Sequence, residues 1–299
     1  MKVVNFGSLN IDHVYTLDHI VTPGETLACA SLDIVAGGKG MNQSVALAKC
    51  GVDTVHAGCV GTDGGWLRDM LVGVGVDCSY LRDTNCPNGH AVIQVEKNGQ
   101  NSIFIFGGSN QQLTEELIDE TLSNLSGDCM VVMQNETSNI VHVAEKCREL
   151  LIPLAFNPSP VSKDLLASFP FETVDYLLIN ETEGKAISGK ENPEDIITAL
   201  LRKYPKMKLI LTLGSEGALY ADSAQRVSQS AFRVKATDTT AAGDTFTGFF
   251  LGSIIEGYDV QSSLRRACAA SALAVTRPGA VPSIPSRDEV ESFLEANLE

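Results

Sequence analysis

The sequence of 299 residues lacks several features that define common classes of protein. No apolar run approaches the ~20 residues that span a bilayer, so no membrane-spanning helix is expected. The opening residues, MKVVNFGSLN, turn polar too soon for a signal peptide, which predicts a cytoplasmic protein. Basic residues are scarce, with 22 Lys and Arg against 37 Asp and Glu and a formal net charge of −15. A broad surface for nucleic acid or an anionic membrane is therefore not expected.

Common catalytic and metal-binding patterns are missing as well. The eight cysteines form no C-x-x-C pair and most lie in apolar stretches, so we interpret them as reduced core thiols. The five histidines show neither metal-ligand spacing nor a Ser-His-Asp arrangement. Neither G-x-S-x-G nor G-x-G-x-x-G occurs, which disfavours a hydrolase and a dehydrogenase. An anionic substrate would need backbone N–H groups, a helix N-terminus or a bound cation.

Short β-branched runs alternate with helical patterns along the chain. Strands are expected at residues 2–7, 54–61, 129–136, 152–157, 174–180 and 208–214. Helices are expected near residues 40–50, 64–73, 114–123, 138–150 and 193–203. This alternation predicts an α/β fold with αβα layers around a mostly parallel central sheet. Ligands of such sheets bind at the carboxyl ends of the strands.

Two stretches interrupt the alternation. Residues 90–108 predict a hairpin with a turn at Asn98-Gly99, and residues 10–36 alternate polar and apolar positions. Together they predict a small sheet that stands off the main domain. Residues 242–276 predict two helices broken near EGYDV. Small residues in the second helix suit either close helix packing or a flat ligand.

The stretch TDTTAAGDTFTGFF, residues 237–250, carries the clearest chemical signal. It places Asp244 after Ala241, Ala242 and Gly243 and before an apolar helix. The free N–H groups and dipole of a helix N-terminus favour an anion, and small side chains let a ligand approach. These features predict a site for a phosphoryl group in transfer, with Asp244 as general base. The alternative is that Asp244 only caps the helix.

A second glycine-rich stretch, AGGKGMNQSVALAKCG, also precedes an expected helix. It is not a P-loop, because Lys39 is not followed by Ser or Thr. Its glycines let a substrate touch the backbone, and Asn42 offers a donor and acceptors. Asn10 and Asp12 point the same way on an extended segment, as paired contacts to a sugar would. Ordinary polar and Gly-rich turns are the alternatives.

Three weaker signals follow. Asn180 and Glu183 in INETEG suit a metal-bound water, or simply begin a helix. Glycines in LTLGSEGALY would let nucleotide phosphates approach the backbone, although hairpin turns have the same composition. The loop VTRPGAVPSIP exposes carbonyl oxygens that, with Asp238, can replace the hydration shell of potassium. Otherwise this loop is a rigid linker to the final helix.

Together the motifs resemble the ribokinase (PfkB) family of carbohydrate kinases over nearly the whole chain. They occur in the order GSLNIDH, GGKGMNQ, NPSP, INETE, TLGSEG, DTTAAGDTF and AVTRPGAVPSIP. The resemblance implies one ribokinase-like kinase domain over residues 1–299, with a β-sheet lid from about 10–36 and 88–108. It implies transfer of the γ-phosphoryl group of ATP to a sugar hydroxymethyl group, O5 of D-ribose, in D-ribose catabolism. Magnesium, an activating potassium ion and a homodimer joined through the lids are also implied.

The resemblance assigns roles to individual positions. The catalytic residues are Asp244 as base, with Ala241, Ala242 and Gly243 as the anion hole. The implied sugar contacts are Asn10, Asp12, Gly38, Lys39, Gly40, Asn42, Glu136 and Asp244. The implied nucleotide contacts are Asn180, Thr212, Gly214, Ser215, Gly217, Gly243 and Cys268, with Glu183 as the acid near magnesium. The implied potassium loop comprises Asp238, Thr240, Ala274, Arg277, Gly279 and Ser283, several through backbone carbonyls.

Four departures from the family pattern bear on specificity. Met41 replaces a small residue or proline, Asn135 replaces an aliphatic residue, and FGGSN replaces a small-residue run. These three concern sugar choice, whereas Cys268, in place of a histidine, concerns nucleotide affinity. None affects Asp244. One alternative is therefore a kinase for another acceptor, namely fructose, deoxyribose or a nucleoside. Asn10 and Asp12 favour a polyhydroxylated sugar over a nucleoside. The other alternative is a non-catalytic sugar-binding sensor.

Overall fold

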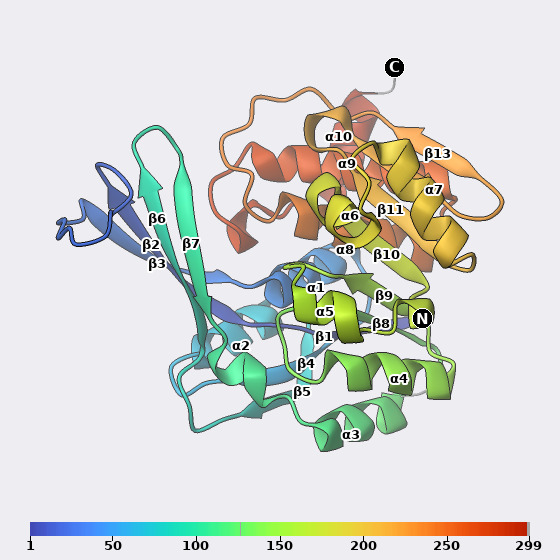
Figure 1. Cartoon of the computed structure of the whole chain (residues 1–299), viewed down its shortest axis with the longest axis horizontal. Coiled ribbons are helices and arrows are strands. Elements are labelled where there is room, and N and C mark those ends of the chain that lie inside the picture. The colour runs from blue at the N-terminus through green and yellow to red at the C-terminus, as the bar shows by residue number, and fades with distance from the viewer. Residues whose placement is uncertain (126, 298–299) are drawn as a thin grey trace.

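The computed structural model describes residues 1–125 and 127–297. Within them, a nine-stranded sheet is covered by helices on both faces, and a second sheet of four strands projects to one side (Figure 1). The helices of these residues include none with the length and apolarity needed to cross a bilayer. The eight cysteines are free thiols, as the sequence predicts.

The large sheet is mostly parallel, which confirms the predicted α/β class. Its strands, in spatial order, are β13 (Arg226–Gln229), β12 (Ala218–Ala221), β11 (Lys208–Thr212), β10 (Tyr176–Asn180), β9 (Leu154–Asn157), β8 (Cys129–Gln134), β1 (Lys2–Phe6), β4 (Thr54–Val60) and β5 (Asp77–Asp83). The antiparallel pairs of this sheet are β11 with β12 and β12 with β13. Each expected strand is present, and the parallel strands end at a common edge.

Two hydrophobic cores occupy the two faces of this sheet. One face is covered by α1 (Lys39–Cys50), α2 (Gly65–Gly73), α8 (Ala242–Ile255), α9 (Val260–Val275) and α10 (Arg287–Ala296). The other is covered by α3 (Glu115–Leu125), α4 (Ile140–Leu150), α5 (Lys163–Ser168), α6 (Glu181–Ser188) and α7 (Pro193–Lys203). Burial of this apolar surface is the main force that holds the layers together.

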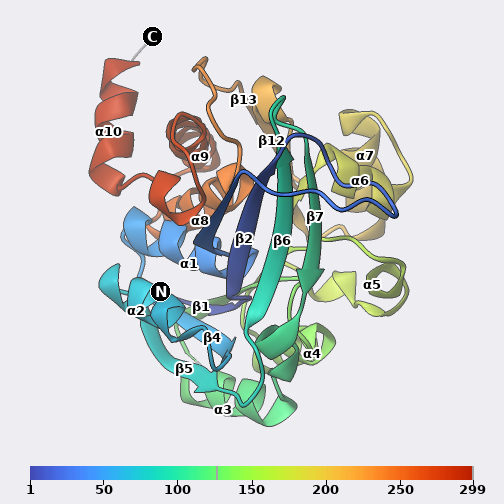
Figure 2. The same ribbon diagram turned by 90° about the vertical axis from the view of Figure 1, so that its left-hand side faces the viewer.

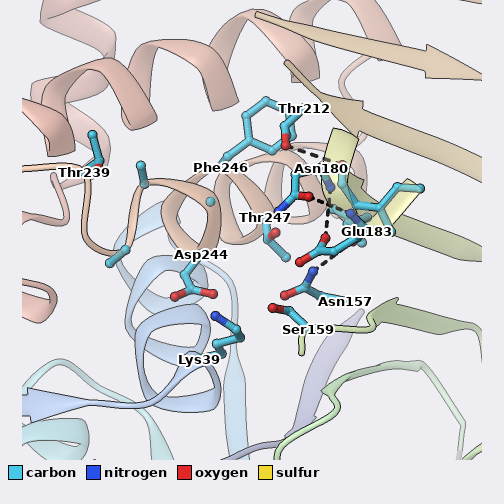
Figure 3. A pocket seen from close by; sticks show the side chains of 15 residues that line it. Lys39, Asn157, Ser159, Asn180, Glu183, Thr212, Thr239, Asp244, Phe246 and Thr247 are labelled. Atoms are coloured by element: carbon cyan, nitrogen blue, oxygen red, sulfur yellow. Dashed lines mark hydrogen bonds between the residues drawn. The ribbon is translucent and has the colours of Figure 1, made fainter. Parts of the chain in front are cut away.

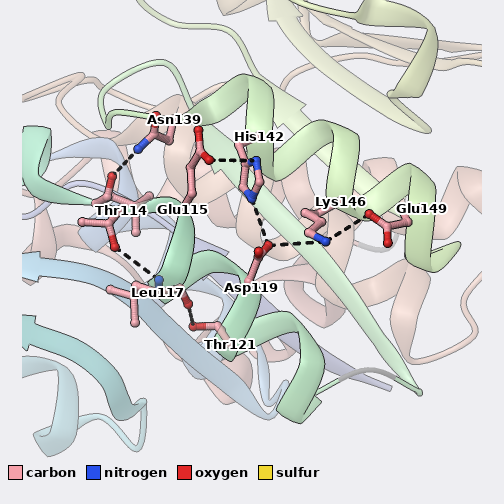
Figure 4. A network of polar contacts seen from close by, with 10 residues as sticks. Thr114, Glu115, Leu117, Asp119, Thr121, Asn139, His142, Lys146 and Glu149 are labelled. Carbon is pink, nitrogen blue, oxygen red and sulfur yellow. Dashed lines mark hydrogen bonds and ion pairs between the residues drawn. The ribbon is translucent and has the colours of Figure 1, made fainter.

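A polar network fastens α3 to α4 at the surface (Figure 4). Asp119 lies 2.9 Å from Nε2 of His142 and 3.6 Å from the ammonium group of Lys146, while Glu115 lies 3.8 Å from Nδ1 of the histidine. Thr114, Glu115 and Asn139 also line a pocket of about 340 Å³, which shares no residue with the two pockets at the start of α8. The polar contacts join α3 to α4, so we interpret the network as structural.

Helix α8 packs against α1 with almost no space between them. A Cβ atom added to Gly248 would lie only 2.4 Å from Cβ of Ala46, so a larger residue there would push the helices apart. Every residue of α8 from Asp244 to Ser253 is buried. This contact brings the first turn of α8 next to the first turn of α1, and it therefore positions Asp244.

The second sheet has the strand order β3 (Ser31–Gly37), β2 (Asn10–Leu17), β6 (Gly89–Glu96) and β7 (Asn101–Phe106), and it faces the viewer in Figure 2. Strands β6 and β7 form the predicted hairpin, with Gly99 at a positive φ of 85° in the turn. Strands β2 and β6 pair in parallel, so the small sheet is mixed. Asn10 and Asp12 lie at the start of β2, shortly after the end of β1, and we call this end of the small sheet its base.

Candidate active site

The first turn of α8 carries unpaired N–H groups next to Asp244. Ala241 adopts the left-handed conformation, with φ of 58°, and ends the preceding loop. The N–H of Ala242 donates to the carbonyl oxygen of Thr239 at 3.3 Å. Within the described residues, the N–H groups of Gly243 and Asp244 make no such bond. An anion here would accept from these N–H groups and be stabilised by the helix dipole.

The Asp244 carboxylate is held by α1 and faces a pocket. Nδ2 of Asn42 and Nε2 of Gln43 each donate to one of its oxygens at 2.9 Å. The side chain is 9% exposed, yet it lines a pocket of about 220 Å³ (Figure 3). The carboxylate is therefore bonded to α1 and reaches a cavity, and it makes no hydrogen bond that caps its own helix.

Lys39 gives the same pocket a positive charge. Its side chain points toward Asp244 from the start of α1 (Figure 3). Burial alone would lower the pKa of Lys39, but the charges of Asp244, Glu136, Glu183 and Asp12 outweigh it and raise the pKa. The ammonium group is thus charged, and it lies where it can neutralise a ligand that brings negative charge into this acidic site.

A second pocket, of about 460 Å³, continues from the first. The two share Thr212, Gly243 and Phe246 among their lining residues. The second is mainly apolar and runs between the 214–217 turn and α9, where Cys268 and Ala272 line it. The small residues of α9 therefore agree with both interpretations, because α9 packs closely on α8 and also borders a slot that could hold a flat ligand. Burial raises the pKa of Cys268 to about 12, so its thiol is neutral.

Asn180 and Glu183 form a reciprocal cap at the start of α6. Oδ1 of Asn180 accepts from the N–H of Glu183, and Oε2 of Glu183 accepts from the N–H of Asn180, both at 2.9 Å. This is the ordinary helix start that the sequence left open as an alternative. Both residues nevertheless line the first pocket, and the described residues offer no hydrogen bond to the other oxygen of Glu183 (Figure 3).

The predicted sugar contacts converge at the base of the small sheet. Glu136 accepts from the hydroxyl of Ser8 and from the N–H of Lys39. Burial raises the pKa of Glu136, although Lys39 opposes this shift. The pKa of Asp12 is raised to about 7, mainly by burial and then by the negative charge of Glu136, while the charge of Lys39 acts against both. Gly38 has a φ of 92° and lies against the backbone of Ser8 and Asn10, where a side chain would not fit. Gly40 packs against Ser8 in the same way.

The predicted specificity residues lie in different places. Met41 is fully buried in the core and lines neither large pocket. Nδ2 of Asn135 donates to the carbonyl oxygen of Pro160 at 2.6 Å. Asn110, from FGGSN, is buried and donates to Oδ1 of Asn10 at 2.7 Å, so it orients a predicted sugar contact. Asn110 was not among the predicted sugar contacts, although it is the last residue of FGGSN.

The predicted potassium loop is partly assembled around Asp238. Its carboxylate accepts from the N–H and hydroxyl of Thr240 and from the N–H of Gly279. Burial would raise the pKa of Asp238, but these hydrogen bonds outweigh it and lower the pKa. The guanidinium group of Arg277 bonds to Glu289, so only its backbone carbonyl could bind a cation, and the hydroxyl of Ser283 donates to the carbonyl oxygen of Ala280. Ala274 is buried at the end of α9.

Some polar residues of the site carry no clear sequence signal. Gln43, Gln134 and Asn157 form side-chain hydrogen bonds around Asp244, and Ser159 and Thr247 line the first pocket. Gln43 and Gln134 lie in stretches singled out from the sequence, but a buried amide without a known partner gives no indication of its role. Their grouping becomes visible only when β8, β9 and α1 are placed together.

A carboxylate between a polar site and a cleft, with unpaired N–H groups beside it, is an arrangement suited to the transfer of a phosphoryl group to an alcohol. The pfkB family of carbohydrate kinases matches residues 1–287, and the chain belongs to this family. It is 35% identical over 296 residues to ribokinase from Bacillus subtilis, and the aligned region covers 96% of this chain and 97% of that protein.

Two further relatives bear on the substrate. The chain is 32% identical over 307 residues to deoxyribokinase from Salmonella typhi, with 99% of this chain and 100% of that protein covered. The structure of Arabidopsis thaliana ribokinase complexed with ribose and ATP superposes with a TM-score of 0.85 at 31% identity and covers 98% of each chain. The predicted family and fold are therefore confirmed.

Proposed function

We propose that the chain is a ribokinase that transfers the γ-phosphoryl group of ATP to the 5-hydroxyl group of D-ribose, giving ribose 5-phosphate and ADP. The observation that carries the proposal is the position of Asp244, between the polar base of the small sheet and the cleft that leads to α9. The names of several relatives and the bound ligands of the Arabidopsis structure support ribose and ATP. We place the enzyme in the cytoplasm.

The sugar is held by groups that converge below the small sheet. In this proposal its hydroxyls bind Asn10, Asp12, Asn42 and Glu136, and its ring lies on the backbone of Gly38, Lys39 and Gly40. Oδ1 of Asn42 is buried without a partner among the described residues, so it can accept from a hydroxyl. Asp244 then accepts the proton of the 5-hydroxyl as that oxygen attacks the γ-phosphorus and the bond to ADP breaks.

The nucleotide lies along the two joined pockets. Its triphosphate approaches Asn180, Thr212, Gly214, Ser215 and Gly217, and its base enters the apolar slot at Cys268. The N–H groups of Gly243 and Asp244, with the loop of Ala241 and Ala242, stabilise the charge of the phosphoryl group in transfer. The ammonium group of Lys39 adds a positive charge at the same point.

Magnesium fits this site only together with the nucleotide. The described residues contain no cluster of three His, Cys, Asp or Glu that would hold a metal. Mg²⁺ bound by phosphates needs only one or two carboxylates and several waters. Glu183 and Asn180 would hold it through such waters, and it would neutralise the β- and γ-phosphates, which offsets the repulsion from an acidic chain.

The whole chain, residues 1–299, acts as one kinase domain in this proposal, with segments 10–36 and 88–108 as its lid. Strands from both segments pair in the small sheet, which borders the sugar site. Closure of the sheet over the sugar would exclude water and limit hydrolysis of ATP.

Potassium is expected to raise kcat relative to sodium at equal ionic strength, because Asp238 supplies an ionised carboxylate beside carbonyls of the 275–285 loop. The proposed ligands are Asp238, Thr240, Ala274, Arg277, Gly279 and Ser283. Asp238→Asn is expected to remove most of the difference, as measured by initial rates in potassium and sodium buffers. Equal rates for the unsubstituted enzyme in both buffers would rule out an activating cation site.

The lid is also the proposed dimer interface. By strand register, Ile34, Val92 and Phe104 align with His13 on the face opposite Asp12. Ile34 and Phe104 are more than half exposed, an unusual state for large apolar side chains. We expect sedimentation to show a dimer that Phe104→Glu dissociates, and an unchanged monomer in both samples would refute this interface.

A panel of acceptors tests the substrate. With ATP, magnesium and potassium, we expect ribose to give the highest kcat/KM and deoxyribose, fructose, adenosine and inosine to give lower values. Deoxyribose is the most relevant rival because of the deoxyribokinase relative. Preference for another acceptor would replace ribose while keeping the reaction. Binding of ribose without any phosphorylated product would instead indicate a non-catalytic sugar sensor.

A further inference from the structure

Asp244 has one hydrogen-bond partner with no part in the function proposed above. Asn42 is a proposed sugar contact, but Gln43 is fully buried and lines neither large pocket. Its Nε2 donates to Oδ1 of Asp244 at 2.9 Å. Gln43 is therefore placed to orient the carboxylate without touching either substrate.

A chain of buried amides holds Gln43 from behind. Nε2 of Gln134, at the end of β8, donates to Oε1 of Gln43 at 2.7 Å and to Oδ1 of Asn5 at 3.0 Å. Nδ2 of Asn5, on β1, donates to the carbonyl oxygen of Gly40 and to Oγ of Ser44, both at 2.8 Å. None of these side chains is more than 1% exposed.

Backbone carbonyls fix the donor-to-acceptor direction of the hydrogen bonds between these amides. An amide side chain can be turned by 180° unless a neighbour only accepts or only donates. The carbonyl of Gly40 only accepts, so Asn5 presents Nδ2 to it and Oδ1 to Gln134. Gln134 must then donate through Nε2, which fixes Oε1 of Gln43 toward Gln134 and its Nε2 toward Asp244.

The hydrogen bonds that run from Asn5 through Ser44 to His56 have a consistent donor-to-acceptor direction. Nε2 of His56 lies 3.2 Å from the carbonyl oxygen of Gly7, which only accepts, so this nitrogen carries the ring proton. Burial lowers the pKa of His56 to about 4, which keeps the ring neutral. Its Nδ1 then accepts from Oγ of Ser44 at 2.8 Å, and Ser44 in turn accepts from Asn5.

We propose that Gln43 is a positioning residue for the phosphoryl transfer, and that Asn5 and Gln134 keep its N–H directed at Asp244. The bond orients the carboxylate and leaves a lone pair for the 5-hydroxyl. This inference rests on the proposed role of Asp244 as the base.

The experiment uses the full chain and two substitutions. Gln43→Met removes the N–H with little change of volume. Gln134→Met likewise removes a donor and adds no charge, so Gln43 loses one of the bonds that fix its direction although residue 134 does not touch Asp244. For both, we expect kcat to fall about 10–100-fold, because misplacing a reacting group can cost ~10²-fold. The KM values for ribose and ATP should change less than about twofold.

The pH profile separates positioning from a general loss of packing. Removal of an N–H donor raises the pKa of a carboxylate, so the acid limb of kcat should move to higher pH in both variants. The other charged groups near Asp244 are Lys39 and Glu136, with Glu183 and Asp12 beside Lys39, and all are kept. Thr121→Val, which loses a buried hydrogen bond in α3, should change neither kcat nor the profile.

Each outcome decides the proposal. Thermal unfolding and ribose binding by calorimetry report on folding, and if Gln43→Met fails to fold, Gln134→Met decides alone. A folded variant with unchanged kcat and an unshifted acid limb overturns the inference while the unsubstituted enzyme still phosphorylates ribose. If the unsubstituted enzyme produces no ribose phosphate, the proposed function itself has failed.

Discussion

Replacing Asp244 with Asn is expected to lower kcat about 10²–10⁴-fold, the usual cost of losing a positioned general base. The amide has nearly the same shape but cannot take the proton of the 5-hydroxyl. Ribose and ATP should still bind, because the groups proposed to hold them are unchanged. The test combines initial rates with calorimetric measurement of both dissociation constants.

Asp288→Asn is the matched control for this experiment. Asp288 also lies in the first turn of a helix, α10, but it is exposed and lines neither of the two pockets at the start of α8. If Asp244 only stabilised a helix start, the two variants would lose a similar small amount of stability and keep their rates. Near-normal turnover of the Asp244 variant would therefore remove it as the base.

Gly243→Pro is expected to lower kcat about 10²–10³-fold, the usual cost of removing one donor from an oxyanion site. Proline has no N–H, and a helix tolerates it in the first turn better than in the interior. The N–H of Gly243 makes no hydrogen bond within the described residues, so the loss falls on the phosphoryl group in transfer. Rates and thermal unfolding should be measured together.

Gly243→Ala provides the control, because alanine keeps the N–H. A Cβ atom added at this position would meet nothing within 4 Å, so it does not disturb the protein. We expect this variant to retain a far larger share of kcat than the proline variant. If both fall equally while both remain folded, the backbone N–H does not stabilise the transferred group.

In the large sheet, the sequence predicted the buried strands but missed the two edge strands. Strands such as β8 and β10 are buried on both faces and form continuous apolar runs, which are easily recognised. The strands β5 and β13 lie at the two edges of the large sheet and mix exposed and half-buried residues. Their polar composition has no run or strict alternation, and only pairing with a neighbouring strand makes them β structure.

The sequence also indicated the proposed base, Asp244, better than its surroundings. Asp244 was identified because a helix start has its own chemistry, independent of distant residues. Gln43, Gln134 and Asn5 gave no such signal, since an amide gains a direction only from its partners in space. Met41 was interpreted as bearing on sugar choice, but its apolar side chain is buried in the core and lines neither of the two pockets at the start of α8.

The most direct test is a crystal structure of the protein with D-ribose and a nonhydrolysable ATP analogue. We predict the 5-hydroxyl within hydrogen-bond distance of the Asp244 carboxylate, about 2.6–3.2 Å. The γ-phosphoryl group should face the N–H of Gly243. A sugar that turns its 5-hydroxyl away from Asp244, or a triphosphate that ends outside the joined pockets, would contradict the account.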